Sequence, residues 1–209
     1  MKIYKAVFPF LLSLALFPGM ALASDNSNLS SNENTTAESV AFIKDLSAKY
    51  KIDLSKTVIA YNKTPEPIVI PDGMSNYINP VTKEYFIFSK PSEKSSVARE
   101  FNFDIYRYVR GPSFSISSST LSVWAQSVLY DGEESYSKPA YGSTYTIRLA
   151  HEGLFGRAKG VSFPINSSQT STFGSSWNTN KKVYVEVDND GSFHESRQNL
   201  VGNGVVYNM

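Results

Sequence analysis

Histidine is the side chain best suited to acid–base chemistry near neutral pH, and this 209-residue sequence has two, His151 and His194. Glu152 follows His151 and serines are abundant, so a hydrolase that uses His151, Glu152 and a serine nucleophile is one hypothesis. The sequence contains no G-x-S-x-G nucleophile elbow and no H-E-x-x-H zinc motif. We therefore assign no catalytic residue and favour a non-catalytic function over an enzymatic one.

Acidic residues gather around a turn near the end of the chain, in Asp188-Asn189-Asp190-Gly191 with Glu195 close behind. Calcium takes about six to eight oxygen ligands, which an acid-rich loop containing a glycine can supply. The spacing departs from that of an EF-hand, because Glu195 comes too soon after Gly191. Asn, Asp and Gly also favour β-turns for backbone reasons. A plain turn is the favoured interpretation and a calcium site at Asp188, Asp190 and Glu195 is the alternative; no other cofactor is expected.

Two tryptophans are candidates for ligand binding, because aromatic rings can stack on sugar rings. Trp124 shares one face of an alternating segment with Ser122 and Gln126, and Trp177 lies in a polar link. Both placements are compatible with exposure at the surface. We name Trp124 and Trp177 as candidate binding residues, with packing inside the core as the alternative for each.

Apolar and polar residues alternate along several segments of the second half of the sequence, most clearly in 121–126, 144–149 and 183–188. A period of two, with Gly, Asn, Asp and Ser between the segments, is typical of antiparallel strands that bury one face. The pattern predicts a mainly β fold, an antiparallel β-sandwich of Ig-like or jelly-roll-like type, over residues 97–209.

A short α-helix is expected before the sandwich. Val40, Ile43 and Leu46 recur at three-residue spacing, and the helix should begin near Thr36. Prolines then punctuate residues 64–91, which favours short or edge strands, because interior strands reject proline. Residues 37–96 are therefore expected to form a helix followed by a proline-rich extended segment.

Residues 1–23 have the three parts of a secretory signal peptide: Lys2 and Lys5, an apolar run over 6–20, and Ala21-Leu22-Ala23. The apolar run is about 15 residues long, shorter than the roughly 20 that a membrane-spanning helix needs. We expect cleavage, secretion to the extracellular space and no membrane span. Residues 24–36 are polar and are expected to be a flexible leader.

Composition excludes several function classes. The sequence has no cysteine, which rules out disulfides, a thiolate nucleophile and Cys-ligated metals, and in a secreted protein favours a bacterial source. Cleavage would remove two of the 20 basic residues and none of the 19 acidic ones, so the net charge of the secreted chain would be close to zero. Without a global basic field, no nucleic-acid partner is expected.

The stretch from Ser143 to Tyr207 has a strand, a Gly-rich turn over 153–156, a second strand, a polar link and two closing strands around 189–191. In this rhythm it resembles the pre-peptidase C-terminal β-sandwich modules of bacterial secreted enzymes. The resemblance implies an accessory or binding module. The acidic pair of that family is replaced here by Thr146 and Arg148, so its calcium site is not carried over.

These observations favour a secreted, non-catalytic β-sandwich protein that binds an extracellular or cell-surface partner, either a polysaccharide or a protein. One alternative is the hydrolase centred on His151 and Glu152. The other is a membrane-active, pore-forming toxin, whose inserting hairpin would come from the alternating Ser-rich segment 114–130. The sequence does not predict an oligomeric state.

Overall fold

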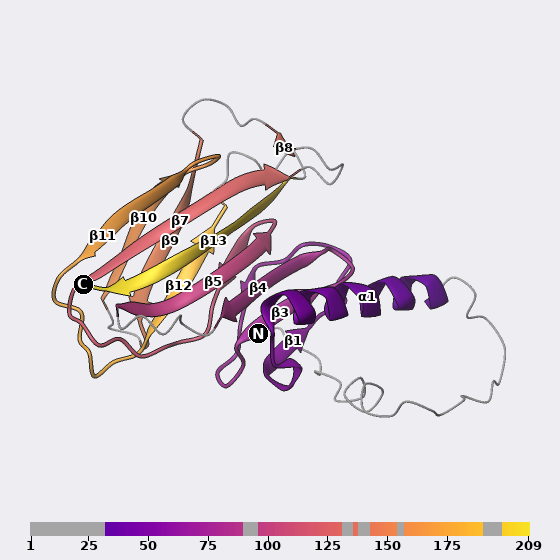
Figure 1. The fold of residues 1–209 in the computed structure, drawn as a ribbon, viewed down its shortest axis with the longest axis horizontal. Helices are drawn as coiled ribbons and strands as arrows, with labels where there is room; N and C mark the ends of the chain where they lie inside the picture. The colour runs from indigo at the N-terminus through magenta and orange to yellow at the C-terminus, as the bar shows by residue number, and fades with distance from the viewer. Residues whose placement is uncertain (1–31, 90–95, 131–135, 138–142, 154–156, 190–197) are drawn as a thin grey trace.

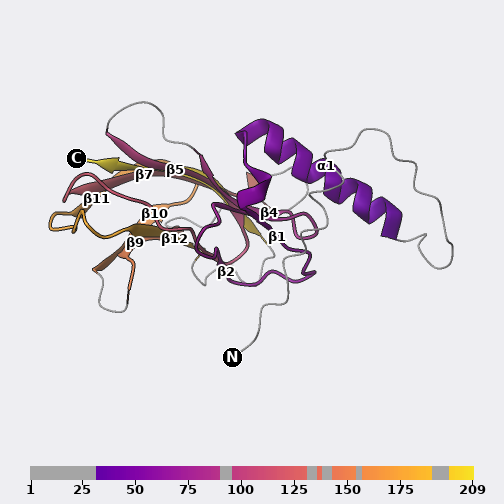
Figure 2. The same ribbon diagram turned by 90° about the horizontal axis from the view of Figure 1, so that it is seen from below.

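The computed structural model describes residues 32–89, 96–130, 136–137, 143–153, 157–189 and 198–209. Within these residues the fold is mainly β, with two sheets packed on one another and one α-helix near the N-terminus (Figures 1 and 2). The prediction of a mainly β, sandwich-like fold preceded by a short helix is therefore confirmed.

The larger sheet has the strand order β1-β3-β4-β5-β13-β7-β11, and β8 also pairs with β7. Its centre joins segments from distant parts of the chain, because the C-terminal strand β13 lies between β5 and β7. The bounds are β1 Thr57–Ile59, β3 Asn76–Asn79, β4 Glu84–Ser89, β5 Val97–Ile105, β7 Leu121–Tyr130, β8 Tyr136–Ser137, β11 Ser168–Gly174 and β13 Asn199–Asn208.

The smaller sheet has the order β10-β9-β12-β6-β2. Two pairs in the described chain are parallel, β1 with β3 and β2 with β6, so both sheets are mixed. Parallel strands need a crossover connection. Between β1 and β3 the chain provides one, because it passes to the smaller sheet, forms β2 there and then returns to the larger sheet. The bounds are β2 Ile68–Val69, β6 Tyr108–Arg110, β9 Thr144–His151, β10 Ala158–Pro164 and β12 Val183–Asp188.

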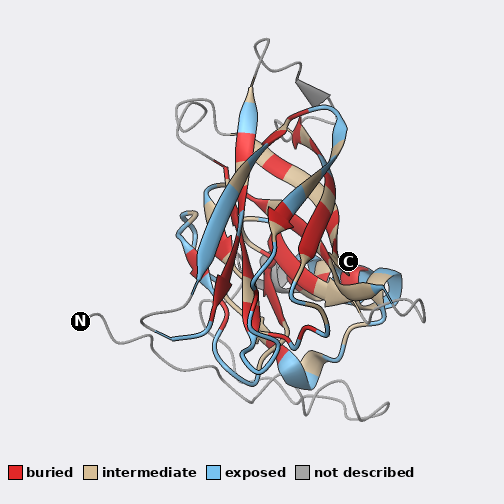
Figure 3. Cartoon of the chain, turned by 90° about the vertical axis from the view of Figure 1, so that its left-hand side faces the viewer, coloured by how far each residue is buried: buried red, intermediate tan, exposed pale blue. Residues whose placement is uncertain are grey.

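The core lies between the two sheets, where most buried residues are found (Figure 3). The alternation expected for the three segments 121–126, 144–149 and 183–188 is confirmed, since the apolar members of each are buried. Rings of Phe86, Phe101 and Phe103 stack in sequence across β4 and β5. Burial of this apolar surface is the main stabilising contribution to such a fold.

Helix α1 (Asn32–Tyr50) covers the outer face of the larger sheet at its β3–β4 end (Figure 2). Ile43 and Leu46 pack on Ile78 and on outward-facing residues of β4, so the predicted helical spacing is confirmed. The expected start near Thr36 is corrected to Asn32. Residues 32–36 contain no glycine or proline, so nothing in them stops the helix from extending towards the N-terminus. A 3-10 helix, η2 (Leu54–Lys56), follows α1.

The proline-rich segment contributes to the same sheet as the second half of the chain. β4 pairs with β5 across the position where we expected the sandwich to begin, at residue 97. The core correspondingly contains Ile68, Ile70 and Phe86 together with residues of the second half. None of the helices in the described residues has the length and apolar character needed to cross a membrane.

Candidate functional site

A groove with a volume of about 410 Å³ lies on the outer face of the larger sheet. One wall is the C-terminal end of α1, with Lys49 and Tyr50, and the opposite wall is the segment 166–167 that leads into β11. The floor is formed by β5, β13, β7 and the first residue of β11. The groove thus exists because α1 covers only one end of the sheet, and no other described helix covers the outer face of the central strands.

Three side-chain amides cross the floor of the groove in one row. In the strand register Asn203 of β13 is opposite both Asn102 of β5 and Gln126 of β7. Gln126 Nε2 donates to Asn203 Oδ1 at 3.0 Å, and Asn102 Nδ2 donates to Ser89 Oγ at 3.2 Å. Among the described residues no protein group engages Gln126 Oε1 or Asn203 Nδ2. We call Asn102, Asn203 and Gln126 the amide row; it offers donors and acceptors side by side.

Aromatic rings border the amide row on the α1 side. Tyr50 of α1 and Tyr85 of β4 have ring centroids 6.0 Å apart and hydroxyl oxygens 3.4 Å apart. Both side chains line the groove. This edge therefore combines apolar ring surface with hydroxyl groups.

Trp124 lies on the same outer face as the amide row, two residues before Gln126 on β7. It is half-buried, and its cross-strand neighbours are Val205 and Thr170. The prediction that Trp124 points away from the core side of its strand is confirmed. Its role as a binding residue stays a prediction.

An acid whose charge changes near neutral pH lies beside the groove. Asp104 of β5 has Tyr85 and Val201, both groove residues, as its cross-strand partners. Burial raises the pKa of Asp104 to about 7, opposed by the hydrogen bond that Asn199 Nδ2 donates to its Oδ1 at 2.7 Å and assisted by the nearby charge of Glu84. The carboxyl group is therefore partly neutral at physiological pH.

Trp177 does not lie at the surface, and the expectation of exposure is wrong for this residue. Only 2% of it is exposed, and it belongs to the core between the sheets. The positive φ of 75° at Ser176 turns the chain, Trp177 N donates to Ser119 O at 2.9 Å, and the indole Nε1 donates to Phe173 O at 3.2 Å. The polar link folds back over the core and buries the ring, so Trp177 offers no exposed face for stacking on a sugar.

His151 is buried and packs on Trp177, with ring centroids 5.0 Å apart. Its Nε2 accepts a hydrogen bond from the backbone N–H of Asn178 at 3.1 Å, and its buried Nδ1 has no hydrogen-bond partner among the described residues. Glu152 is exposed, and its Oε1 accepts from Ser113 Oγ at 3.2 Å. Successive strand residues point to opposite faces. Within the described chain His151 is hydrogen-bonded to neither Glu152 nor a serine, so the hydrolase alternative gains no support there.

The predicted calcium ligands are only partly within the described chain. Asp188 is the last residue of β12. Asp190 and Glu195, and with them His194, lie outside the described residues. Within the part of the chain that the structure describes, no three acidic or histidine side chains gather as a metal site would require. The calcium site around Asp188 stays a prediction.

Sequence reasoning did not identify the amide row or the two tyrosines. A signal existed for Asn102, which stands between Phe101 and Phe103 in an alternating segment and so had to face outward. No sequence pattern indicated that Asn203 and Gln126, 77 residues apart, would be direct neighbours.

No protein-family model matches the chain, and no curated protein matches it. The resemblance of residues 143–207 to pre-peptidase C-terminal modules consequently stays a prediction.

Proposed function

We propose that the protein is a secreted, non-catalytic binding protein and that its ligand is a polysaccharide held in the groove beside α1. The amide row is the observation that carries this proposal. Each side-chain amide has both a donor nitrogen and an acceptor oxygen, and neighbouring sugar hydroxyls require both. Tyr50 and Tyr85 add ring surface against which the apolar face of a sugar can pack.

The size and shape of the groove agree with this ligand. Its volume of about 410 Å³ is in the range found for small-molecule sites, roughly 300–1,000 Å³. The floor runs across four strands from Asn102 on β5 to Ser168 on β11. Three strand spacings correspond to about 14 Å. A groove of this length on an open sheet face suits a section of a chain-like ligand.

The groove chemistry favours a neutral polymer. Its floor is formed by amides, hydroxyls, a glycine and the two valines Val128 and Val201, and Lys49 at the rim is the one charged side chain among the described residues that line it. A highly charged partner would need more complementary charges for specific recognition. Trp124, in the next row of the same face, extends the surface if the polymer runs along β7.

Isothermal titration of the purified full chain against neutral and acidic polysaccharides tests this function. Neutral polymers should bind, and Gln126→Ala or Asn203→Ala should each weaken binding about tenfold, the effect of losing one or two net hydrogen bonds. Asn180→Ala is the matched control, because it removes an exposed amide from the loop before β12 and should leave the affinity unchanged.

Two results would contradict the proposal. One is the absence of binding to every polysaccharide in the set. The other is binding that survives both amide-row substitutions, which would place the ligand on another surface. In the first case, a cell-surface protein becomes the preferred partner, and the same two variants would test whether it uses the groove.

A further inference from the structure

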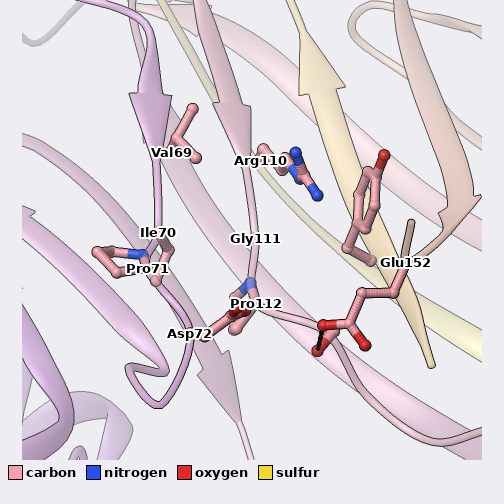
Figure 4. A pocket seen from close by; sticks show the side chains of 10 residues that line it. Val69, Ile70, Pro71, Asp72, Arg110, Gly111, Pro112 and Glu152 are labelled. Atoms are coloured by element: carbon pink, nitrogen blue, oxygen red, sulfur yellow. Dashed lines mark hydrogen bonds between the residues drawn. The ribbon is translucent and has the colours of Figure 1, made fainter. Parts of the chain in front are cut away.

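A second cavity, with a volume of about 190 Å³, lies on the other side of the sandwich, at the β2 edge of the smaller sheet (Figure 4). It is bounded by the segment 69–72 that includes the end of β2, by residues 110–113 at the end of β6, and by Glu152 and Tyr184. No residue of this cavity lines the groove beside α1. The two sites can therefore be tested independently.

Arg110 forms the cationic end of the cavity. Its guanidinium carbon lies 3.7 Å from the ring centroid of Tyr184, a cation–π contact that holds the guanidinium in place. Glu186 is the cross-strand neighbour of both Arg110 and Arg148, but its carboxylate pairs with Arg148 Nε at 3.3 Å. Among the described residues Arg110 has no carboxylate partner, so its N–H donors remain available to a ligand.

Two carboxylates form the anionic end. Glu152 is held by the hydroxyl of Ser113, which donates to its Oε1 at 3.2 Å. Figure 4 shows Asp72 and Glu152 at the end of the cavity away from Arg110, with Gly111 and Pro112 between the two ends. Both carboxylates belong to exposed residues. The cavity is therefore polarised along its length.

The space between the charged ends is apolar. Val69 is 52% exposed, and Ile70, Pro71 and Pro112 complete this part of the lining. Gly111 keeps the floor close to the core, because a Cβ there would lie 2.7 Å from Cε1 of Phe86. Its backbone N–H donates to Val185 O at 2.8 Å, which fixes the strand that carries Arg110. The lining is thus suited to small apolar groups flanked by charges.

We propose that this cavity binds a short peptide, with the peptide's carboxylate at Arg110 and its ammonium at Asp72 and Glu152. The chain from Arg110 to Ser113 runs beside β12, so the charged ends are separated by two to three residues of extended chain, roughly 7–10 Å. The termini of an extended tripeptide are separated by the same amount. A ligand with only a carboxylate would leave two acidic side chains opposite it without compensation, whereas a zwitterion complements both ends.

Isothermal titration with trialanine at low salt tests the proposal on the unaltered full chain. Three forms are compared: the free tripeptide, its N-acetylated form and its C-terminal amide. The free form should bind, and each cap should weaken binding about tenfold, because each removes one charge-assisted hydrogen-bonded contact. Raising the salt concentration should weaken binding of the free form towards that of the capped forms.

Substitutions then assign each end of the peptide. In Arg110→Gln the free tripeptide should bind about tenfold more weakly, and C-terminal amidation should cause no further loss. In Glu152→Gln, N-acetylation of the peptide should lower the affinity by a smaller factor than in the unaltered protein, because one of the two carboxylates that contact the ammonium group is already gone. Some loss should remain, because Asp72 is still present. Arg107→Gln makes the same charge change at an exposed site outside the cavity and should bind as the unaltered protein does.

Three results would overturn the proposal: no binding of trialanine at millimolar concentration, equal binding of the free and capped peptides, or binding of glucuronate as tight as that of the tripeptide. The last would show that a carboxylate alone is recognised. Because the capped peptides are compared on the unaltered protein, these outcomes do not depend on whether Arg110→Gln folds.

Discussion

The ring of Phe101 lies over Gly204 of the neighbouring strand, so closely that a Cβ atom at position 204 would be 2.4 Å from Phe101 Cζ. Gly202 has the same relation to Phe103, at 2.6 Å. These inward-facing glycines let β13 pass flat over the two rings, and Asn203 between them points outward. The same contact that fills the core thus places Asn203 in the amide row.

Gly204→Ala should destabilise the protein, because the added methyl group has no room beside Phe101. We expect the free energy of unfolding to fall by about 1–3 kcal/mol, the usual effect of overpacking a core. Urea denaturation followed by circular dichroism measures the change. Gly160→Ala in β10 is the control, since a Cβ there makes an ordinary contact of 3.4 Å with Thr146. Equal effects of the two substitutions would contradict the close packing on Phe101.

Trp177→Ala should be far more destabilising than Trp124→Ala. Removing the buried indole of Trp177 leaves a cavity and is expected to lower the free energy of unfolding by about 3–5 kcal/mol. Trp124 is half-buried on the outer face, so its replacement should cost clearly less. Urea denaturation of both variants provides the comparison. A loss for Trp124→Ala as large as that for Trp177→Ala would show that the burial difference does not hold in solution.

Stability should fall as the pH rises from 5 to 8, owing to Asp104. Its pKa of about 7 in the folded chain lies above the ordinary value of 3.8 for an aspartate, so between these values the folded state binds more protons than the unfolded state. The contribution of Asp104 is therefore complete below about pH 4 and is lost as the pH rises through about 7. A pKa shift of this size corresponds in full to roughly 4 kcal/mol of folding free energy.

Asp104→Asn isolates this effect. The amide keeps an oxygen that can accept from Asn199 Nδ2 but cannot ionise. Urea denaturation at pH 5 and pH 8 should show a smaller loss of stability on raising the pH than in the unaltered protein. An unchanged pH dependence in the variant would assign it to other groups, of which Glu84, whose pKa is also raised chiefly by burial, is the nearest candidate.

His151→Ala should reduce stability without affecting binding in the groove. The substitution removes the acceptor for Asn178 N–H and the ring that packs on Trp177, and we expect a loss of about 1–3 kcal/mol. Polysaccharide affinity should stay the same, because His151 does not line the groove. Turnover of any substrate in a broad hydrolase panel, abolished by His151→Ala in a variant that still folds, would restore the catalytic alternative.

Much of the local structure was readable from the sequence. The faces of β7, β9 and β12 followed from alternation, since successive strand residues point to opposite sides whichever strand lies beside them. The helix followed from Val40, Ile43 and Leu46 for a similar reason. The C-terminal strand was harder to recognise. In the sequence, residues 202–204 interrupt the apolar residues of this region and so resemble a break between two short strands. In the structure they lie inside the single strand β13. The strand persists there because the Phe101 and Phe103 rings fill the space that side chains would occupy.

The sequence by itself therefore determined which residues face the core in most strands. This property depends only on the alternation of apolar and polar residues within a single segment. Only the tertiary structure decided which strands are neighbours. It placed β13 between β5 and β7, which assembled the amide row, and it folded the polar link over the core, which buried Trp177. Strand order depends on contacts between residues far apart in the chain, and no periodicity within one segment records them.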